Sequence, residues 1–168
     1  MATLHFVSGR AGAGKTTLAR KIAADVHAVL ICEDEWMSRL ADPIEHLHEY
    51  LAAAAKIRRV IAPLTVDLLR LGVPVVFDFS GNTVRDRTWV RSICQQADAG
   101  HVLHYIRADD DTCRARVAER NASKPAGLYF GDVSDAQLDE VNRFFVPPGA
   151  DEGLTIVVHD AHGSTGSP

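Results

Sequence analysis

The sequence is poor in several features that mark other classes of protein. Its 168 residues contain only three cysteines, which are widely spaced, and this disfavours a disulfide framework or a zinc site and predicts the reduced thiols of a cytoplasmic protein. No apolar run is long enough to cross a bilayer, and residues 1–30 lack the pattern of a secretory signal peptide. The net charge of −4 argues against a bulk polyanion-binding protein, although it leaves room for a local basic patch. We therefore expect no membrane partner.

The rest of the composition is that of an ordinary globular protein. Apolar residues make up 46% and charged residues 24% of the chain, and the length suits one domain with a sizeable core. No internal repeat is present. We expect a single domain over residues 1–160, with a lid at about 115–133 and a flexible polar tail over 161–168.

One segment near the N-terminus carries the clearest chemical signal, because it matches the phosphate-binding pattern G-x-x-x-x-G-K-[ST]. Glycines let the backbone turn with its N–H groups pointing inward, so that the amides form a cradle for phosphate oxygens. Lys15 is then expected to reach the β- and γ-phosphates, and the Thr16 hydroxyl to bind Mg²⁺. The predicted nucleotide-binding residues are Gly9, Arg10, Ala11, Gly12, Ala13, Gly14, Lys15, Thr16 and Thr17.

The context of this segment favours a nucleoside-triphosphate site over a glycine-rich turn that binds nothing. Residues 3–8 predict a short buried strand, and residues 15–26 place Leu18, Ile22 and Val26 on one helical face. A helix that begins at the loop adds its unsatisfied N–H groups and the positive end of its dipole.

The chain alternates between strand and helix patterns. Apolar runs at 3–8, 28–32, 73–79, 101–106 and 154–159 predict five strands, and helices are expected at about 15–26, 84–98, 109–121 and 135–145. Residues 44–71 predict two helices broken near Pro63, with Ile57, Val60, Ile61 and Leu64 on one stripe. Continuous apolar strands separated by helices indicate an α/β protein with the three-layer α/β/α P-loop NTPase fold, in which helices cover both faces of a five-stranded parallel sheet.

Two carboxylates are expected at the edge where ligands bind to such sheets. Asp34 follows the second strand and is a candidate base for the proton of a nucleophile. The alternative is that Glu33, Asp34 and Glu35 only supply charge to a helix N-terminus. Asp78 ends an apolar run and is a candidate to hold Mg²⁺ through water, or it braces the following loop, and the sequence supports both interpretations equally.

A basic cluster follows the fourth predicted strand. Arg116 and Arg120 share a helix face, and Lys124 continues toward a glycine- and proline-containing loop at 122–133. Positive groups there are candidates for a lid that stabilises charge on a transferring phosphoryl group. The alternative is a solvated basic face whose charges pair with Glu119 and the neighbouring aspartates. Within the loop, Tyr129 and Phe130 either shield the site from water or pin the loop to the core.

Together these segments resemble the small P-loop kinases, a group that includes 5′-polynucleotide kinases, chloramphenicol phosphotransferase, zeta toxins and gluconate kinase. The resemblance covers about residues 1–125 and rests on Gly9–Thr17, Asp34, the pattern Asp78-x-x-x-Asn82 and Arg120 before a loop. It implies ATP on the phosphate loop and Asp34 as the base that activates the acceptor hydroxyl. It also implies contacts from the lid arginines, Arg116 and Arg120, to the ATP phosphates.

The sequence departs from the polynucleotide kinases at one position. Those enzymes carry a phosphate-binding arginine three residues after the base, and Met37 stands there in this chain. This disfavours a nucleic-acid acceptor, as does the acidic net charge.

The predicted function is therefore that of an ATP- and Mg²⁺-dependent phosphotransferase acting on a hydroxyl of a small-molecule acceptor. Lys15, Asp34, Arg116 and Arg120 are the predicted catalytic residues, and Thr16 and Asp78 the predicted metal ligands. A 5′-hydroxyl nucleic-acid kinase and a nucleotide-binding ATPase or switch without an acceptor remain open. No motif in residues 36–72 or 122–133 identifies the acceptor.

Overall fold

The computed structural model describes residues 1–40, 47–126 and 131–161. Strands and helices alternate along these residues, as the hydrophobic pattern predicts. The elements are β1 Thr3–Ser8, α1 Lys15–Asp25, β2 Val29–Cys32, α2 Glu33–Leu40, α3 Leu47–Arg70, β3 Val75–Ser80, α4 Val84–Ala97, β4 Gly100–Arg107, α5 Asp110–Ser123, α6 Asp135–Asn142, a 3₁₀ turn Ala150–Glu152 and β5 Ile156–Asp160.

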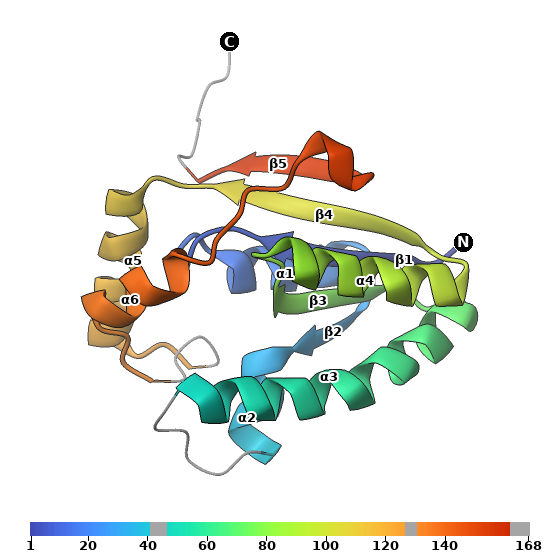
Figure 1. The fold of residues 1–168 in the computed structure, drawn as a ribbon, viewed down its shortest axis with the longest axis horizontal. Helices are drawn as coiled ribbons and strands as arrows, with labels where there is room; N and C mark the ends of the chain where they lie inside the picture. The colour runs from blue at the N-terminus through green and yellow to red at the C-terminus, as the bar shows by residue number, and fades with distance from the viewer. Residues whose placement is uncertain (41–46, 127–130, 162–168) are drawn as a thin grey trace.

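The five strands form one parallel sheet in the order β2-β3-β1-β4-β5. Strand β1 therefore lies at the centre, between β3 and β4. Because all strands run the same way, their carboxyl ends meet at one edge of the sheet, where α5 and α6 also lie, at the left of Figure 1. The segments that follow β1, β2, β3 and β4 are brought together there.

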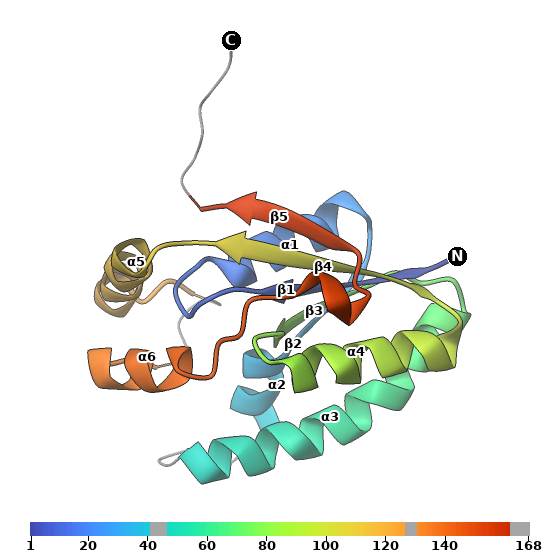
Figure 2. The ribbon, with the colours of Figure 1, turned by 45° about the horizontal axis from the view of Figure 1, so that its top comes forward.

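Helices cover both faces of the sheet (Figures 1 and 2). Helices α3 and α4 cover one face, where Leu4, Phe6 and Phe77 are buried with side chains of both helices. Helix α1 covers the other face and packs Ala19 and Ile22 against the strands. The predicted three-layer α/β/α fold is confirmed.

The prediction of two helices broken at Pro63 is wrong, because α3 runs without interruption from Leu47 to Arg70. Pro63 is exposed on the solvent side of α3, so the backbone carbonyl of Arg59, which has no N–H partner at Pro63, can be hydrated. The inner side of the helix buries Ile61 and Leu69. This burial holds the helix together across the proline.

The buried side of α3 also differs from the predicted stripe. Ile57 and Ile61 are buried as expected, but Val60 is 60% and Leu64 42% exposed. The buried face of α3 includes Leu69 in place of Val60 and Leu64, because α3 packs against α4 as well as β3. A stripe of four apolar residues does not decide which edge faces the core.

The two predicted carboxylates lie within secondary structure rather than in loops. Asp78 lies inside β3, two residues before the end of the strand. Helix α2 begins directly after β2, so Asp34 belongs to the first turn of α2. Tyr129 and Phe130 lie outside the described residues. Among the described residues, no helix is both long enough and apolar enough to span a membrane.

Candidate active site

The phosphate-binding loop connects β1 to α1, and its shape depends on glycine. Gly12 and Gly14 have φ angles of 83° and 100°, in the left-handed region that other residues avoid. A Cβ atom on Gly12 would lie 2.4 Å from the carbonyl oxygen of Cys113 on α5. The glycine pattern is therefore required by the backbone and by the close approach of α5.

The helix that follows the loop has no side-chain cap at its N-terminus. Gly14 is the N-cap residue of α1, and no acidic residue lies in the first turn. Helices α4, α5 and α6, by contrast, are capped by the side chains of Thr83, Asp109 and Ser134. The first N–H groups of α1 thus have no side-chain acceptor, which is the arrangement that binds anions.

Lys15 lies folded over the loop. Its Nζ donates to the carbonyl oxygens of Gly9, at 2.7 Å, and Arg10, at 2.9 Å. Burial lowers the pKa of Lys15 to about 8, and the nearby carboxylates of Asp78 and Asp34 oppose this effect. An anion in the loop would favour the charged ammonium further.

Asp34 and Asp78 both line the same cavity as the phosphate loop. Solvent reaches Asp34, but partial burial in the cavity raises the pKa of its carboxyl group, and the negative charge of Asp78 raises it further. The positive charges of Lys15 and Arg120 lower this pKa. Asp78 Oδ2 accepts a hydrogen bond from the Cys32 thiol at 3.4 Å. Burial and the Asp78 charge raise the pKa of Cys32 to about 12, so the thiol remains a donor.

Asn82 anchors the first glycine of the loop. Its Oδ1 accepts from the Gly9 N–H at 3.0 Å, and its backbone carbonyl accepts from Val146 N–H at 2.8 Å. The asparagine of the Asp78-x-x-x-Asn82 pattern thus joins the loop after β3 to the phosphate loop. Its side chain sets the position of the loop backbone.

The two predicted lid arginines have different surroundings. Arg116 donates to the carbonyl oxygens of Ala13 and Ala161, both at 2.9 Å, and so connects the phosphate loop to the end of β5. Arg120 lines the cavity, and its buried Nε has no hydrogen-bond partner among the described residues. Its charge acts on both Lys15 and Asp34. Both arginines line the cavity, but Arg120 is the one that keeps a buried donor without a partner among the described residues.

Helix α6 contacts the loop through an asparagine that no sequence pattern singles out. Asn142 Oδ1 accepts from the Ala11 N–H at 3.1 Å. Helix α6 is itself bound to α5, since Arg114 pairs with Asp135 and Asp139. Helices α5 and α6 thus contact the phosphate loop as one unit.

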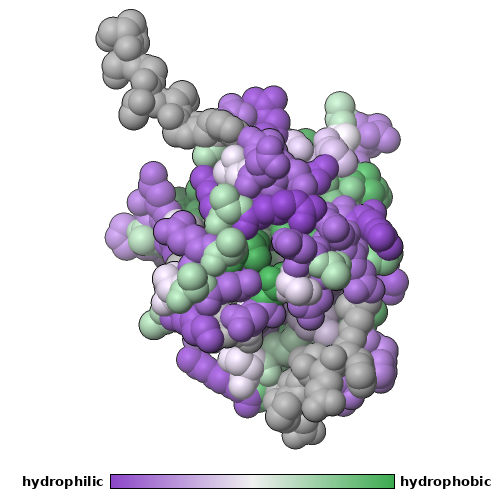
Figure 3. All heavy atoms as spheres, turned by 90° about the vertical axis from the view of Figure 1, so that its left-hand side faces the viewer, coloured by the Kyte–Doolittle hydropathy of each residue, from purple (hydrophilic) through white to green (hydrophobic). Residues whose placement is uncertain are grey.

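These groups surround a cavity of about 1450 Å³ at the carboxyl edge of the sheet, which is larger than the ~300–1,000 Å³ of a typical single-ligand pocket. Figure 3 faces this edge and shows apolar side chains near the centre, bordered by polar ones. One side, which we call the α2 side, is formed by α2, α3 and β3. Its lining residues are Glu33, Asp34, Met37, Ser38, Tyr50, Asp78 and Ser80.

The donor set suits a nucleotide with Mg²⁺ better than a metal held by protein alone. Within the described residues there is no group of three or more His, Cys, Asp or Glu side chains that could hold a metal ion. Thr16 and Asp78 line the cavity with the phosphate loop. Mg²⁺ commonly takes one or two protein ligands and completes its shell with phosphate oxygens and water.

One further feature was not apparent from the sequence. Glu33 is buried and pairs with Arg58, at 2.9 Å, so it serves as an ion-pair partner instead of a free helix-terminal charge. This pairing depends on which helices meet, and a motif does not encode that. Trp36, next to the predicted base, packs against the main core, as expected for an aromatic at the rim of the core.

Comparisons with known proteins agree with this architecture. A family profile described as an AAA domain, AAA_33, matches residues 4–148. No curated protein sequence matches the chain.

Solved structures share the fold at low sequence identity. A candidate kinase from Chloroflexus aurantiacus is 18% identical with a TM-score of 0.74, and the match covers 95% of this chain and 88% of that one. Kti12 of Chaetomium thermophilum in complex with ADP-AlF₃ is 16% identical, with a TM-score of 0.69 and coverage of 92% and 88%. A gluconokinase from Sinorhizobium meliloti is 15% identical, with a TM-score of 0.60 and coverage of 96% and 83%.

The family profile covers most of the chain, and the matched residues include the phosphate-binding loop, Asp34, Asp78 and Arg120. The chain belongs to the AAA_33 family of AAA domains and has the fold of the small P-loop kinases.

Proposed function

We propose that the protein is an ATP- and Mg²⁺-dependent phosphotransferase that moves the γ-phosphoryl group of ATP to a hydroxyl of a small molecule. The observation that carries the proposal is the position of Asp34. This carboxylate lies in the same cavity as the phosphate loop, and the positive charges of Lys15 and Arg120 act on it. A pure nucleotide-binding site has no need of a second carboxylate on the side away from the loop.

In the proposed reaction, Asp34 accepts the proton of the acceptor hydroxyl as its oxygen bonds to phosphorus and the bond to the β-phosphate oxygen breaks. Lys15 and Arg120 stabilise the negative charge on the phosphoryl group during transfer. Thr16 and Asp78 would hold Mg²⁺, which supplies further charge neutralisation on the phosphates. Arg116 keeps the loop in place through Ala13.

The cavity volume supports two bound substrates. Figure 1 shows α5 and α6 at the carboxyl edge of the sheet, with α2 and the start of α3 near the same edge. ATP on the loop would leave the α2 side for the acceptor. Exclusion of water by the two sides favours transfer to the acceptor over hydrolysis.

The first test is ATP turnover by the wild type and by Asp34→Asn, with a panel of antibiotics, sugars, nucleosides and 5′-hydroxyl oligonucleotides. We expect acceptor-dependent transfer that falls by roughly 10²-fold or more in Asp34→Asn, because the amide cannot take a proton. ATP binding should persist. Asp67→Asn, which neutralises an exposed carboxylate on α3, is the matched control. Full transfer activity in Asp34→Asn would rule out the role of Asp34.

An ATPase or switch without an acceptor is the second candidate, and it is favoured by the structure of Kti12, which shares this fold and was solved in complex with ADP-AlF₃. Its signature would be slow ATP hydrolysis that no hydroxyl compound stimulates and that Asp34→Asn leaves unchanged.

A further inference from the structure

The positive charges of the cavity lie on its phosphate side. All 18 lysines and arginines fall in the described part of the chain, since residues 41–46, 127–130 and 162–168 contain neither. Four of them line the cavity: Lys15, Lys21, Arg116 and Arg120. Lys15 and Lys21 belong to the loop and α1, and the two arginines belong to α5.

The α2 side has the opposite character. Its seven lining residues supply three carboxyl groups, three hydroxyl groups and one thioether, and none carries a positive charge. Glu33 is neutralised by Arg58, but Asp34 and Asp78 form no ion pair within the described residues. This side therefore offers hydrogen-bond acceptors and negative charge.

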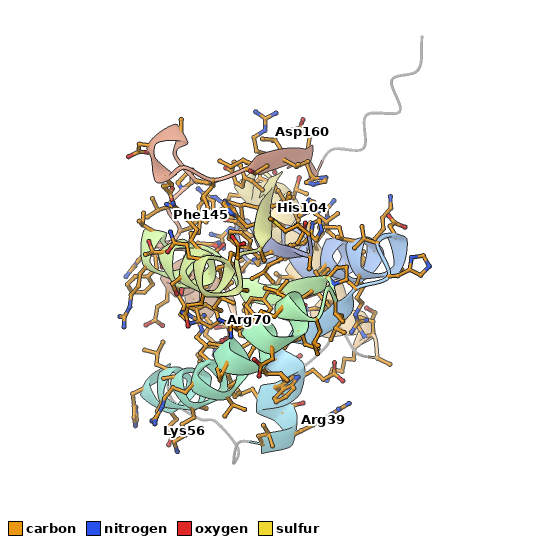
Figure 4. The ribbon with its side chains drawn as sticks, turned by 90° about the vertical axis from the view of Figure 1, so that its right-hand side faces the viewer. Arg39, Lys56, Arg70, His104, Phe145 and Asp160 are labelled. Carbon is orange, nitrogen blue, oxygen red and sulfur yellow. The ribbon has the colours of Figure 1, made fainter. Side chains whose placement is uncertain are left out.

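One arginine of α2 and one of α3, Arg39 and Arg58, are already engaged with carboxylates. Arg39 on α2 bonds to Glu35 at 2.6 Å and is 74% exposed, and Figure 4 shows it extending away from the molecule. Arg58 on α3 bonds to Glu33 at 2.9 Å and Asp86 at 2.7 Å. Its guanidinium also lies 5.0 Å from the Trp89 ring centre. Moving Arg58 into the cavity would leave the buried Glu33 unpaired, which is unfavourable.

We propose that the acceptor carries no phosphate or carboxylate group and is a neutral or positively charged hydroxyl compound, such as a polyol or an amino alcohol. The inference rests on the proposed function. A negative group bound on the α2 side would be repelled by Asp34 and Asp78, because the nearest cations, Lys15, Arg120 and Mg²⁺ held at Asp78, would be engaged with the ATP phosphates. Hydroxyl and ammonium groups can instead donate to these carboxylates and to the hydroxyls of Ser38, Ser80 and Tyr50.

The test uses substrates that differ only in charge. Glucitol, glucamine and gluconate share one hexitol chain with a neutral, cationic or anionic group at its end. Thymidine, 3′-amino-3′-deoxythymidine and thymidine 3′-monophosphate form a second set, whose anionic member mimics a nucleic-acid end. In any set that is phosphorylated, we expect kcat/KM for the neutral or cationic member to exceed that of the anionic member by at least tenfold. Equal or better use of the anionic member would overturn the proposal.

A variant tests whether the α2 side is the source of the discrimination. Ser38→Arg places a guanidinium on this side at an exposed position, and we expect it to raise the relative kcat/KM of the anionic member about tenfold. Ser92→Arg adds the same charge on α4, away from the cavity, and should leave the ratio unchanged. An unchanged ratio in folded Ser38→Arg would overturn the assignment of the α2 side.

The two proposals fail in different ways. ATP binding without transfer to any compound, in these sets or in the wider panel, would overturn the proposed function, and the acceptor proposal with it. Transfer that prefers anionic acceptors would keep the proposed function and overturn only the acceptor proposal.

Discussion

At the scale of single residues, Arg116 and Arg120 lie one turn apart on α5 and have separate tasks. Arg116 is bonded to the backbone of the phosphate loop, whereas Arg120 has a buried donor without a partner and faces Lys15 and Asp34. A buried donor without a partner costs about 1–3 kcal/mol, which an oxygen of the transferring phosphoryl group would recover as it approaches Arg120 in the transition state.

We therefore expect Arg120→Met to lower the transfer rate by roughly 10²-fold or more with a small change in ATP affinity, because its contact forms in the transition state. Arg116→Met should chiefly weaken ATP binding, because the phosphate loop loses the hydrogen bond from Arg116 to the Ala13 carbonyl oxygen. Isothermal titration and single-turnover kinetics separate the two effects, and Arg143→Met, at an exposed arginine after α6, serves as the control. Indistinguishable effects of the two variants would contradict this division.

Three histidines form a hydrogen-bonded row across β1, β4 and β5. His5 Nδ1 lies 3.0 Å from His104 Nε2, and His104 Nδ1 lies 3.0 Å from His159 Nε2. His104, labelled in Figure 4, is the buried central member. Each of the two contacts holds one proton, and the third proton of the three neutral rings lies on an outer nitrogen, His5 Nε2 or His159 Nδ1. The other outer nitrogen can take up one extra proton, but a second extra proton would break a contact.

This row makes stability depend on pH. Burial, with the positive charge of the neighbouring histidines, lowers the pKa of His104 to about 4, so the unfolded chain takes up a proton more readily than the folded protein. The contribution of neutral His104 to the free energy of unfolding is fully present above about pH 6.5 and is lost as the pH decreases toward 4. Urea unfolding should show that the wild type loses about 2 kcal/mol more than His104→Leu between pH 7 and pH 5. His48→Gln, outside the row, is the control, and equal losses in wild type and His104→Leu would contradict the expectation.

At the scale of elements, α3 is a long helix that tolerates a proline in its interior. Pro63 removes one helical hydrogen bond, and its ring crowds the preceding turn. The buried side chains on the inner face keep the helix continuous.

Pro63→Ala should therefore stabilise the protein by about 1–2 kcal/mol, since the restored hydrogen bond outweighs the greater freedom of the unfolded chain. Thermal unfolding would show this as an increase in Tm of several degrees. Pro147→Ala, outside the helices, should give no increase. A lower Tm in Pro63→Ala would mean that Pro63 stabilises the folded protein relative to alanine.

At the scale of the whole molecule, one buried arginine joins the C-terminal segment to the sheet. Arg87 on α4 is fully buried and bonds to both carboxylate oxygens of Glu152, at 2.6 and 2.7 Å. It also donates to the carbonyl oxygens of Gly81 and Val146. These contacts fix the loop that contains Asn82, and through it the position of the phosphate loop.

Glu152→Ala should destabilise the protein by about 3–5 kcal/mol, because it leaves a buried guanidinium without its counter-charge. Asp160→Ala, which breaks the exposed pair with Arg107, is the matched control and should cost far less, because solvent screens that pair. Denaturant unfolding of both variants provides the comparison. A loss of less than about 1 kcal/mol in the free energy of unfolding of Glu152→Ala would show that the Arg87–Glu152 ion pair is not required for stability.

The sequence by itself determined the features that depend on local patterns. The phosphate loop is recognisable because its glycines and Lys15 perform their task within eight residues. The strands and most helices follow from hydrophobic periodicity, and the parallel sheet follows from their alternation. The location of Asp34 and Asp78 beside the phosphate loop was predictable because carboxyl ends of parallel strands share one edge.

Only the tertiary structure decided which distant residues meet. The continuity of α3 through Pro63, the pairing of Glu33 with Arg58 and the bond from Ala11 to Asn142 depend on helix packing. The difference between Arg116 and Arg120 arises likewise, from what each side chain contacts. These contacts join residues far apart in the chain, and their geometry is set by how the core packs rather than by any local pattern.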